Sequence, residues 1–89
     1  MKILVTGGLG FIGSRVVLQL LKRDISVIVA DLDIIKNRDR LENDIKKIGK
    51  NINLISYEKL DITNIENIEK IFQKYNLDSV INLAYGIGS

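Results

Sequence analysis

The sequence predicts an α/β fold built on a parallel sheet, with the element order βαβαβαβ. Four short apolar runs without helical spacing alternate along the 89 residues with three segments whose apolar residues recur at helical spacing. A run of glycines joins the first apolar run to the first helical segment, and the chain contains no proline. Such alternation is typical of parallel sheets, whose strands are connected by right-handed crossovers.

The first strand and the glycine turn after it carry most of the functional information. Residues 3–5 form an apolar run typical of a strand covered on both faces. The following glycines match G-x-G-x-x-G at Gly8, Gly10 and Gly13, and G-x-x-G-x-x-G when counted from Gly7. In a dinucleotide-binding turn these glycines permit the tight turn, the approach of a pyrophosphate and close packing of helix on strand. The unpaired N–H groups at the helix start then face the phosphates.

Two other phosphate-binding loops do not fit these residues. A Walker A loop needs Lys and then Ser or Thr after its last glycine, whereas Ser14 and Arg15 follow Gly13. A kinase glycine loop connects two strands, whereas an amphipathic helix follows here. The remaining alternative is a strand-to-helix turn that binds nothing.

The first helix is predicted over residues 11–23, where the apolar side chains share one face. Its last residues, Lys22 and Arg23, are basic, which suits the negative end of the helix dipole. A second apolar run at residues 27–30 predicts another interior strand.

The second helix is weaker, and the third strand is less apolar than the first two. Leu41, Ile45 and Ile48 recur at helical spacing, and Gly49 is a suitable residue to end that helix. Residues 53–57 predict the third strand, which we place at the edge of the sheet.

The third helix has a marked start, and a fourth strand follows it. Thr63 and Glu66 match a capping box. The expected apolar stripe comprises Ile65, Ile68, Ile71, Phe72 and Tyr75. Residues 79–84 predict the fourth strand, and the glycines beyond Tyr85 indicate close backbone approach to a ligand, with a plain chain terminus as the alternative.

Asp31 directly follows the second strand. In a dinucleotide site a carboxylate here binds the adenosine ribose hydroxyls and repels a 2′-phosphate, which favours NAD over NADP. A solvated aspartate at a loop start is the alternative. NADP remains the alternative cofactor because Lys36, Arg38 and Arg40 follow in a basic segment that could accept the additional phosphate.

Asp61 and Ile62 follow the third strand, at the same sheet edge as Gly10 and Asp31. A carboxylate and an aliphatic side chain can bracket an adenine, the first accepting from its amine and the second packing on its face. An aspartate that only precedes a helix is an equal alternative for Asp61.

Composition narrows the chemistry. The absence of cysteine and histidine removes disulfides, thiol nucleophiles, the usual general base and the commonest metal ligands, so we expect no metal site. A net charge of +2 is too small to indicate nucleic acid. No apolar run approaches the length of a membrane span and no signal peptide is evident, so we expect no membrane contact and a cytoplasmic location.

With the glycine turn on the first strand, the expected strand order is 3-2-1-4. This is a truncated half of a Rossmann-like, doubly wound dinucleotide fold, in which residues 1–89 form one dinucleotide-binding segment. The switch point lies between strands 1 and 4. Residues 7–13 and 83–86 are therefore expected to face each other there.

These residues together resemble a known family. The matching motifs are TGGLGFIG at residues 6–13, Asp31, Asp61 with Ile62, and VINLA at residues 80–84. They resemble the N-terminal portion of the extended short-chain dehydrogenases/reductases, the NAD-dependent nucleotide-sugar epimerases and dehydratases. The resemblance implies contacts in this order: pyrophosphate at Gly7, Gly10, Phe11 and Ile12; adenosine ribose at Asp31; adenine at Asp61 and Ile62; nicotinamide ribose at Leu83, Ala84 and Tyr85.

The chain departs from the family pattern at several positions. Asn82 stands where the family commonly has histidine, Tyr85 where it has alanine, and Asp24 where a glycine often ends the first helix. None of the three tyrosines has lysine four residues later, so the family's Tyr-x-x-x-Lys pair is missing, and its catalytic and sugar-binding regions are expected beyond residue 89.

We therefore expect the NAD-binding segment of a nucleotide-sugar epimerase or dehydratase, a fragment with no catalytic residues of its own. A nucleotide-sugar is expected as ligand only in the full-length parent. A non-enzymatic dinucleotide-binding or regulatory module and an inert structural fragment are the alternatives. Self-association through the fourth strand or an uncovered sheet face is also expected.

Overall fold

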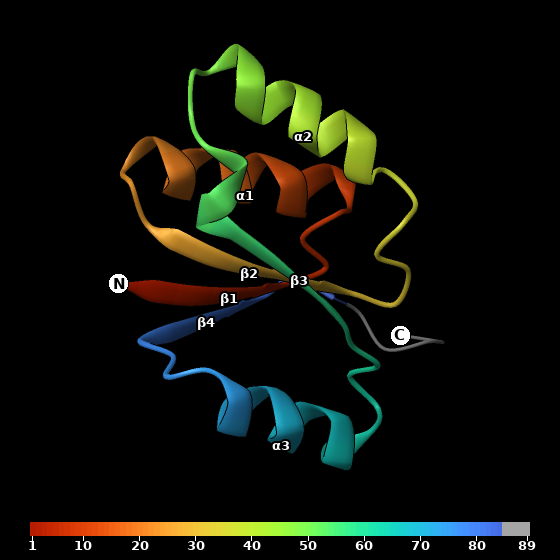
Figure 1. Ribbon diagram of the computed structural model, residues 1–89. Helices are drawn as coiled ribbons and strands as arrows, with labels where there is room; N and C mark the ends of the chain where they lie inside the picture. Colours follow the sequence, from red (N-terminus) through yellow and green to blue (C-terminus); the bar gives the residue numbers. More distant parts are fainter. Residues whose placement is uncertain (85–89) are drawn as a thin grey trace.

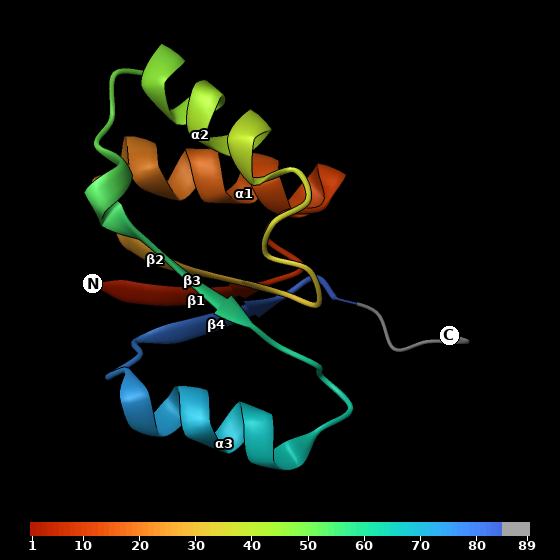
Figure 2. The same cartoon turned by 45° about the vertical axis from the view of Figure 1, so that its right-hand side comes forward.

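The computed structural model describes residues 1–84 and contains one parallel sheet with the strand order β3-β2-β1-β4. Its elements are β1 (Lys2–Thr6), α1 (Phe11–Lys22), β2 (Ser26–Asp31), α2 (Arg38–Lys47), the short 3-10 helix η1 (Ile52–Leu54), β3 (Ile55–Lys59), α3 (Ile65–Lys74) and β4 (Ser79–Asn82). Helices α1 and α2 cover one face of the sheet, and α3 covers the other (Figures 1 and 2). The predicted 3-2-1-4 order is confirmed.

The core has two layers because successive side chains of β1 and β2 point to opposite faces. The layer under α1 and α2 buries Ile3, Val5, Leu9, Val17, Leu21, Val27, Val29, Leu41 and Ile45. The layer under α3 buries Leu4, Ile28, Ala30, Leu60 and Ile71. Since both faces of β1 and β2 are covered, their sequences are continuous apolar runs.

The third strand begins two residues later than predicted. Residues 52–54 form η1, and β3 starts at Ile55. The side chain of Asn51 accepts a hydrogen bond from the backbone N–H of Asn53 at 2.8 Å, which stabilises a turn where the sequence suggested a strand. The strand lies at the sheet edge, as predicted.

The predicted capping box of α3 is wrong. Asn64 is the N-cap, and its side-chain oxygen accepts from the N–H of Asn67 at 3.2 Å. The apolar stripe is also narrower than predicted. Ile71 is 3% exposed, whereas Ile65 is 71% and Phe72 49% exposed. Helix α3 therefore contacts the sheet through a limited face.

Strand β4 ends at Asn82, two residues before the predicted end. It pairs with β1 along one edge, and within residues 1–84 no strand pairs with its other edge. Val80 on β4 is 41% exposed. Among the helices of this described part of the chain, none has the length and apolar character needed to cross a bilayer.

Candidate functional site

The glycine turn between β1 and α1 is tied to β2 and packed against the end of β4. The N–H groups of Gly7 and Gly8 donate to the carbonyl oxygen of Ala30 at 2.8 and 3.3 Å. Gly7 has φ +71°, and a Cβ built on it would lie 3.0 Å from the backbone of Leu83 and Ala84. The expected approach of the glycine turn to residues 83 and 84 is therefore confirmed.

Gly13 allows α1 to begin directly against this turn. A Cβ on Gly13 would lie 1.9 Å from the carbonyl oxygen of Gly7, which leaves no space for any side chain. Close packing of helix on turn thus explains this glycine without any ligand.

Gly10 differs because nothing inside the fold requires it so strictly. Its φ of −75° and ψ of 175° are accessible to any residue, and a Cβ would meet only the carbonyl oxygen of Gly7, at 3.3 Å. Gly10 is the N-cap of α1 and provides no side chain to cap it. Among residues 1–84, no acceptor pairs with the N–H groups of Phe11, Ile12 and Gly13.

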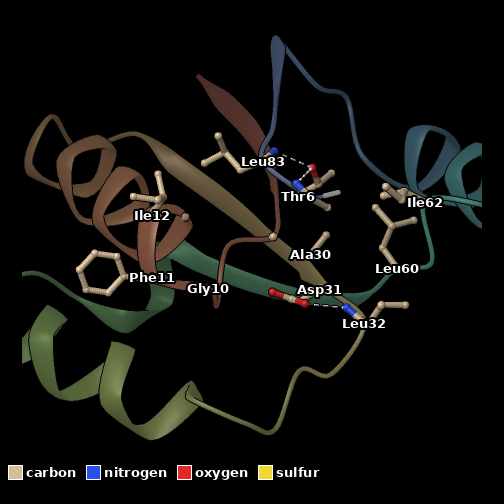
Figure 3. Close-up of a pocket in the computed structure, with 13 residues that line it drawn as sticks. Thr6, Gly10, Phe11, Ile12, Ala30, Asp31, Leu32, Leu60, Ile62 and Leu83 are labelled. Atoms are coloured by element: carbon tan, nitrogen blue, oxygen red, sulfur yellow. Dashed lines mark hydrogen bonds between the residues drawn. The ribbon is translucent and has the colours of Figure 1, made fainter. Parts of the chain in front are cut away.

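These N–H groups lie at a cavity of about 380 Å³ at the carboxyl edge of the sheet. Figure 3 shows Phe11 and Ile12 at one side, Leu60 and Ile62 at the other, and Asp31 near Gly10. The lining residues that the sequence predicted are Gly7, Gly10, Phe11, Ile12, Gly13, Asp31, Ile62, Leu83 and Ala84. Four further residues that the sequence did not predict also line the cavity: Thr6, Ala30, Leu32 and Leu60. Tyr85 lies outside the described residues.

Asp31 provides the only charged side chain among the described residues of the cavity lining. One carboxylate oxygen accepts from the N–H of Leu32 at 2.8 Å, and the other accepts from the N–H of Leu9 at 3.2 Å. Both bonds come from backbone groups of the loops that border the cavity. The carboxylate is therefore fixed in direction.

The basic residues that follow β2 do not line this cavity. Arg38 forms an ion pair with Glu42, with its Nε 3.0 Å from a carboxylate oxygen, and its guanidinium lies 4.3 Å from the ring centroid of Tyr57. Hydrogen bonds from Arg38 and Tyr57 lower the pKa of Glu42, so Glu42 stays ionised at neutral pH. Arg38 is held against α2 and β3.

Asp61 does not line the cavity, although its neighbours Leu60 and Ile62 do. One of its carboxylate oxygens accepts from the hydroxyl of Thr63 at 2.6 Å and from the N–H of Thr63 at 2.9 Å. These two bonds lower the pKa of Asp61. That oxygen stabilises the turn before α3, as the alternative interpretation of Asp61 expected.

Thr6 joins the ends of β1 and β4 at the cavity. It is 5% exposed, and its hydroxyl donates to the side-chain oxygen of Asn82. The same hydroxyl accepts from the N–H of Leu83 at 3.1 Å and of Ala84 at 3.4 Å (Figure 3). A polar residue at the end of an apolar run, directly before the glycines, was the sequence signal for this role.

A parallel 3-2-1-4 sheet with a glycine turn after its first strand defines a Rossmann-like protein. The model of the family described as GDP-mannose 4,6 dehydratase matches residues 4–85. The chain belongs to this family, within the extended short-chain dehydrogenases/reductases that the sequence resembled.

Individual relatives agree with this assignment. UDP-glucose 4-epimerase 2 of Arabidopsis thaliana is 39% identical over 82 residues, which are 92% of this chain and 23% of the relative. The structure of UDP-glucose 4-epimerase from Bifidobacterium longum in complex with NAD+ and UDP superposes with a TM-score of 0.77 at 30% identity, covering 94% of this chain and 24% of that one. Yeast methylglyoxal/isovaleraldehyde reductase complexed with NADPH gives a TM-score of 0.74 at 28% identity, covering 97% of this chain and 25% of that one. The chain thus spans about a quarter of the length of these relatives.

Proposed function

We propose that the chain binds NAD in this cavity, as the cofactor-binding segment of a nucleotide-sugar epimerase or dehydratase. The observation that carries the proposal is the cavity itself, which brings the unpaired first turn of α1 together with the oriented carboxylate of Asp31. A helix N-terminus attracts a pyrophosphate, and a carboxylate binds a ribose diol. Gly10 keeps the space between them open.

The residues on the two sides of the cavity indicate where the two ends of the dinucleotide would lie. Leu32, Leu60 and Ile62 offer an apolar wall on the Asp31 side, which suits the adenine. Leu83 and Ala84, which follow β4, are proposed to lie near the nicotinamide ribose, together with Tyr85. The second carboxylate oxygen of Asp61 is proposed to accept from the adenine amine.

NAD is favoured over NADP by the charge of the site. The carboxylate of Asp31 repels a 2′-phosphate, and no lysine or arginine is among the described cavity-lining residues to compensate. Arg38, the nearest following arginine in the sequence, is held by Glu42 and Tyr57.

Bound NAD supplies hydride transfer, whereas this chain's own residues bind and orient it. The sequence contains no Tyr-x-x-x-Lys pair, so we propose that catalysis and sugar binding require residues outside this segment. A non-enzymatic dinucleotide-binding module shares the same site. The two proposals differ in whether a catalytic region accompanies this segment.

The proposal is tested by calorimetric titration of the chain with NAD, NADP and ADP. NAD and ADP are expected to bind and NADP to bind at least tenfold more weakly. Asp31→Ala should weaken NAD by roughly tenfold, the equivalent of about 1.4 kcal/mol, and narrow the difference from NADP. Asp33→Ala is the matched control, because the carboxylate of Asp33 bonds the backbone of Ile35 and Lys36 and lies outside the cavity lining. Equal effects of the two variants would contradict the proposed role of Asp31.

A further inference from the structure

The loop between β3 and α3 forms one wall of the cavity. Leu60 and Ile62 line the cavity, and Leu60 is 4% exposed and belongs to the core under α3. The N–H of Leu60 donates to the carbonyl oxygen of Asp31 at 2.9 Å, which extends the pairing of β3 with β2. Because β3 is an edge strand, no strand among residues 1–84 pairs with the opposite side of this loop.

The side chain of Asn67 occupies that opposite side. Its Oδ1 accepts from the N–H of Asp61 at 3.0 Å, and its Nδ2 donates to the carbonyl oxygen of Lys59 at 3.4 Å. These two backbone groups flank Leu60, and a neighbouring parallel strand bonds such a pair of groups in the same way. The side-chain amide of Asn67 therefore makes the two hydrogen bonds that a neighbouring strand would make at this edge.

The other hydrogen bonds of the loop connect it only to itself and to the start of α3. Asp61 is bonded by Thr63, and the N–H of Asn64 donates to the carbonyl oxygen of Asp61 at 3.0 Å. Asn67 lies one step further along, in the first turn of α3, the helix that Ile71 anchors in the core. It thus ties the wall of the cavity to a fixed helix.

We propose that Asn67 is a positioning residue, which sets the place of the Leu60–Ile62 loop and so the recognition of the adenine edge. The inference rests on the proposed function, because adenine is the ligand that this wall would meet. Asn67 is not among the cavity-lining residues. Asn67 would therefore affect binding only indirectly, by holding the Leu60–Ile62 loop in position.

The test compares Asn67→Ala with Asn64→Ala by titration with NAD and with nicotinamide hypoxanthine dinucleotide, which replaces the adenine amine by a carbonyl. Both variants remove a side-chain bond at the start of α3, but only Asn67→Ala removes the bonds to the backbone of Lys59 and Asp61. The wild-type chain should prefer NAD by about tenfold, the discrimination that one hydrogen bond provides. Asn67→Ala should reduce this preference to below about threefold, whereas Asn64→Ala should retain it. A general loss of stability affects both ligands equally and leaves the ratio unchanged.

A measurement without ligand accompanies the titration. Hydrogen exchange at the amide of Asp61 should accelerate at least about tenfold more in Asn67→Ala than in Asn64→Ala, because Asn67 is the acceptor for that amide. Retention of the NAD preference in Asn67→Ala, an equal loss in both variants, or equal exchange in both would overturn the inference. Failure of the wild-type chain to bind NAD at all would instead overturn the proposed function, and the adenine role with it.

Discussion

Gly13→Ala is expected to destabilise the fold strongly, whereas Gly10→Ala is expected to change the fold little. The added methyl at Gly13 would lie 1.9 Å from the Gly7 carbonyl oxygen, about 1.5 Å closer than an ordinary contact. The clash is with backbone, so α1 and the turn must separate. At Gly10 the corresponding distance is 3.3 Å, which a shift of a few tenths of an ångström relieves.

The magnitudes follow from these distances. Overpacking of this kind costs about 3 kcal/mol or more. The better helix propensity of alanine offsets about 1 kcal/mol of this cost, so Gly13→Ala should lower the free energy of unfolding by at least about 2 kcal/mol. A chain of 89 residues has a total stability of roughly 4–13 kcal/mol. Gly10→Ala should cost no more than about 1 kcal/mol, the difference between glycine and alanine as an N-cap.

Urea denaturation followed by circular dichroism measures the difference, and NAD titration complements it. With a slope of about 1.5 kcal/mol/M, Gly13→Ala should lower the midpoint by more than about 1 M, and Gly10→Ala by less than about 0.7 M. Gly10→Ala should nevertheless weaken NAD binding at least tenfold, because Gly10 lines the cavity where the pyrophosphate is proposed to lie and a methyl there would take up part of that space. Equal midpoints for the two variants, or undiminished NAD binding by Gly10→Ala, would refute this reasoning.

Three further outcomes are expected. Thr6→Val removes the hydroxyl that accepts from the N–H of Ala84 and leaves the N–H of Leu83 only the carbonyl oxygen of Thr6. It should cost about 1–3 kcal/mol in thermal unfolding, whereas Thr6→Ser should retain most of the stability. Asp24 has φ +60°, a left-handed conformation that glycine adopts freely, aspartate less easily and alanine least easily. Asp24→Gly should therefore raise the free energy of unfolding and Asp24→Ala should lower it. An alanine variant as stable as the glycine variant would contradict this prediction. Sedimentation should show concentration-dependent self-association that Val80→Lys reduces, since Val80 lies on the unpaired edge strand; a clean monomer at high concentration would count against it.

The sequence predicted most accurately those elements for which one physical requirement decides the local structure. The apolar runs of β1 and β2 are buried on both faces, so few alternatives compete with a central strand. The spacing of Gly7, Gly10 and Gly13 follows from the turn geometry and leads directly to the cavity. The strand order was predicted from the glycine turn on the first strand, which is typical of the doubly wound dinucleotide fold.

The errors occur where two local structures compete. Asn51 stabilises a turn that displaces the start of β3, and Asn64 caps α3 although the preceding Thr63 is also a good cap. The sequence pattern cannot decide between two adjacent capping residues, because the side chain of either one can accept from the free N–H groups at the start of the helix. The roles of Thr6 and Asn67 depend on contacts between segments far apart or on different elements, which periodicity does not reveal.

Binding of NAD between the first turn of α1 and the loops after β2 and β3 is tested most directly by amide chemical shifts of the ¹⁵N-labelled chain during titration with NAD. Saturable shifts are expected at Gly10, the 11–13 turn, Leu32 and the 60–62 loop, with the outer face of α2 unchanged. Shifts centred elsewhere, or the absence of saturable shifts, would contradict NAD binding in this cavity.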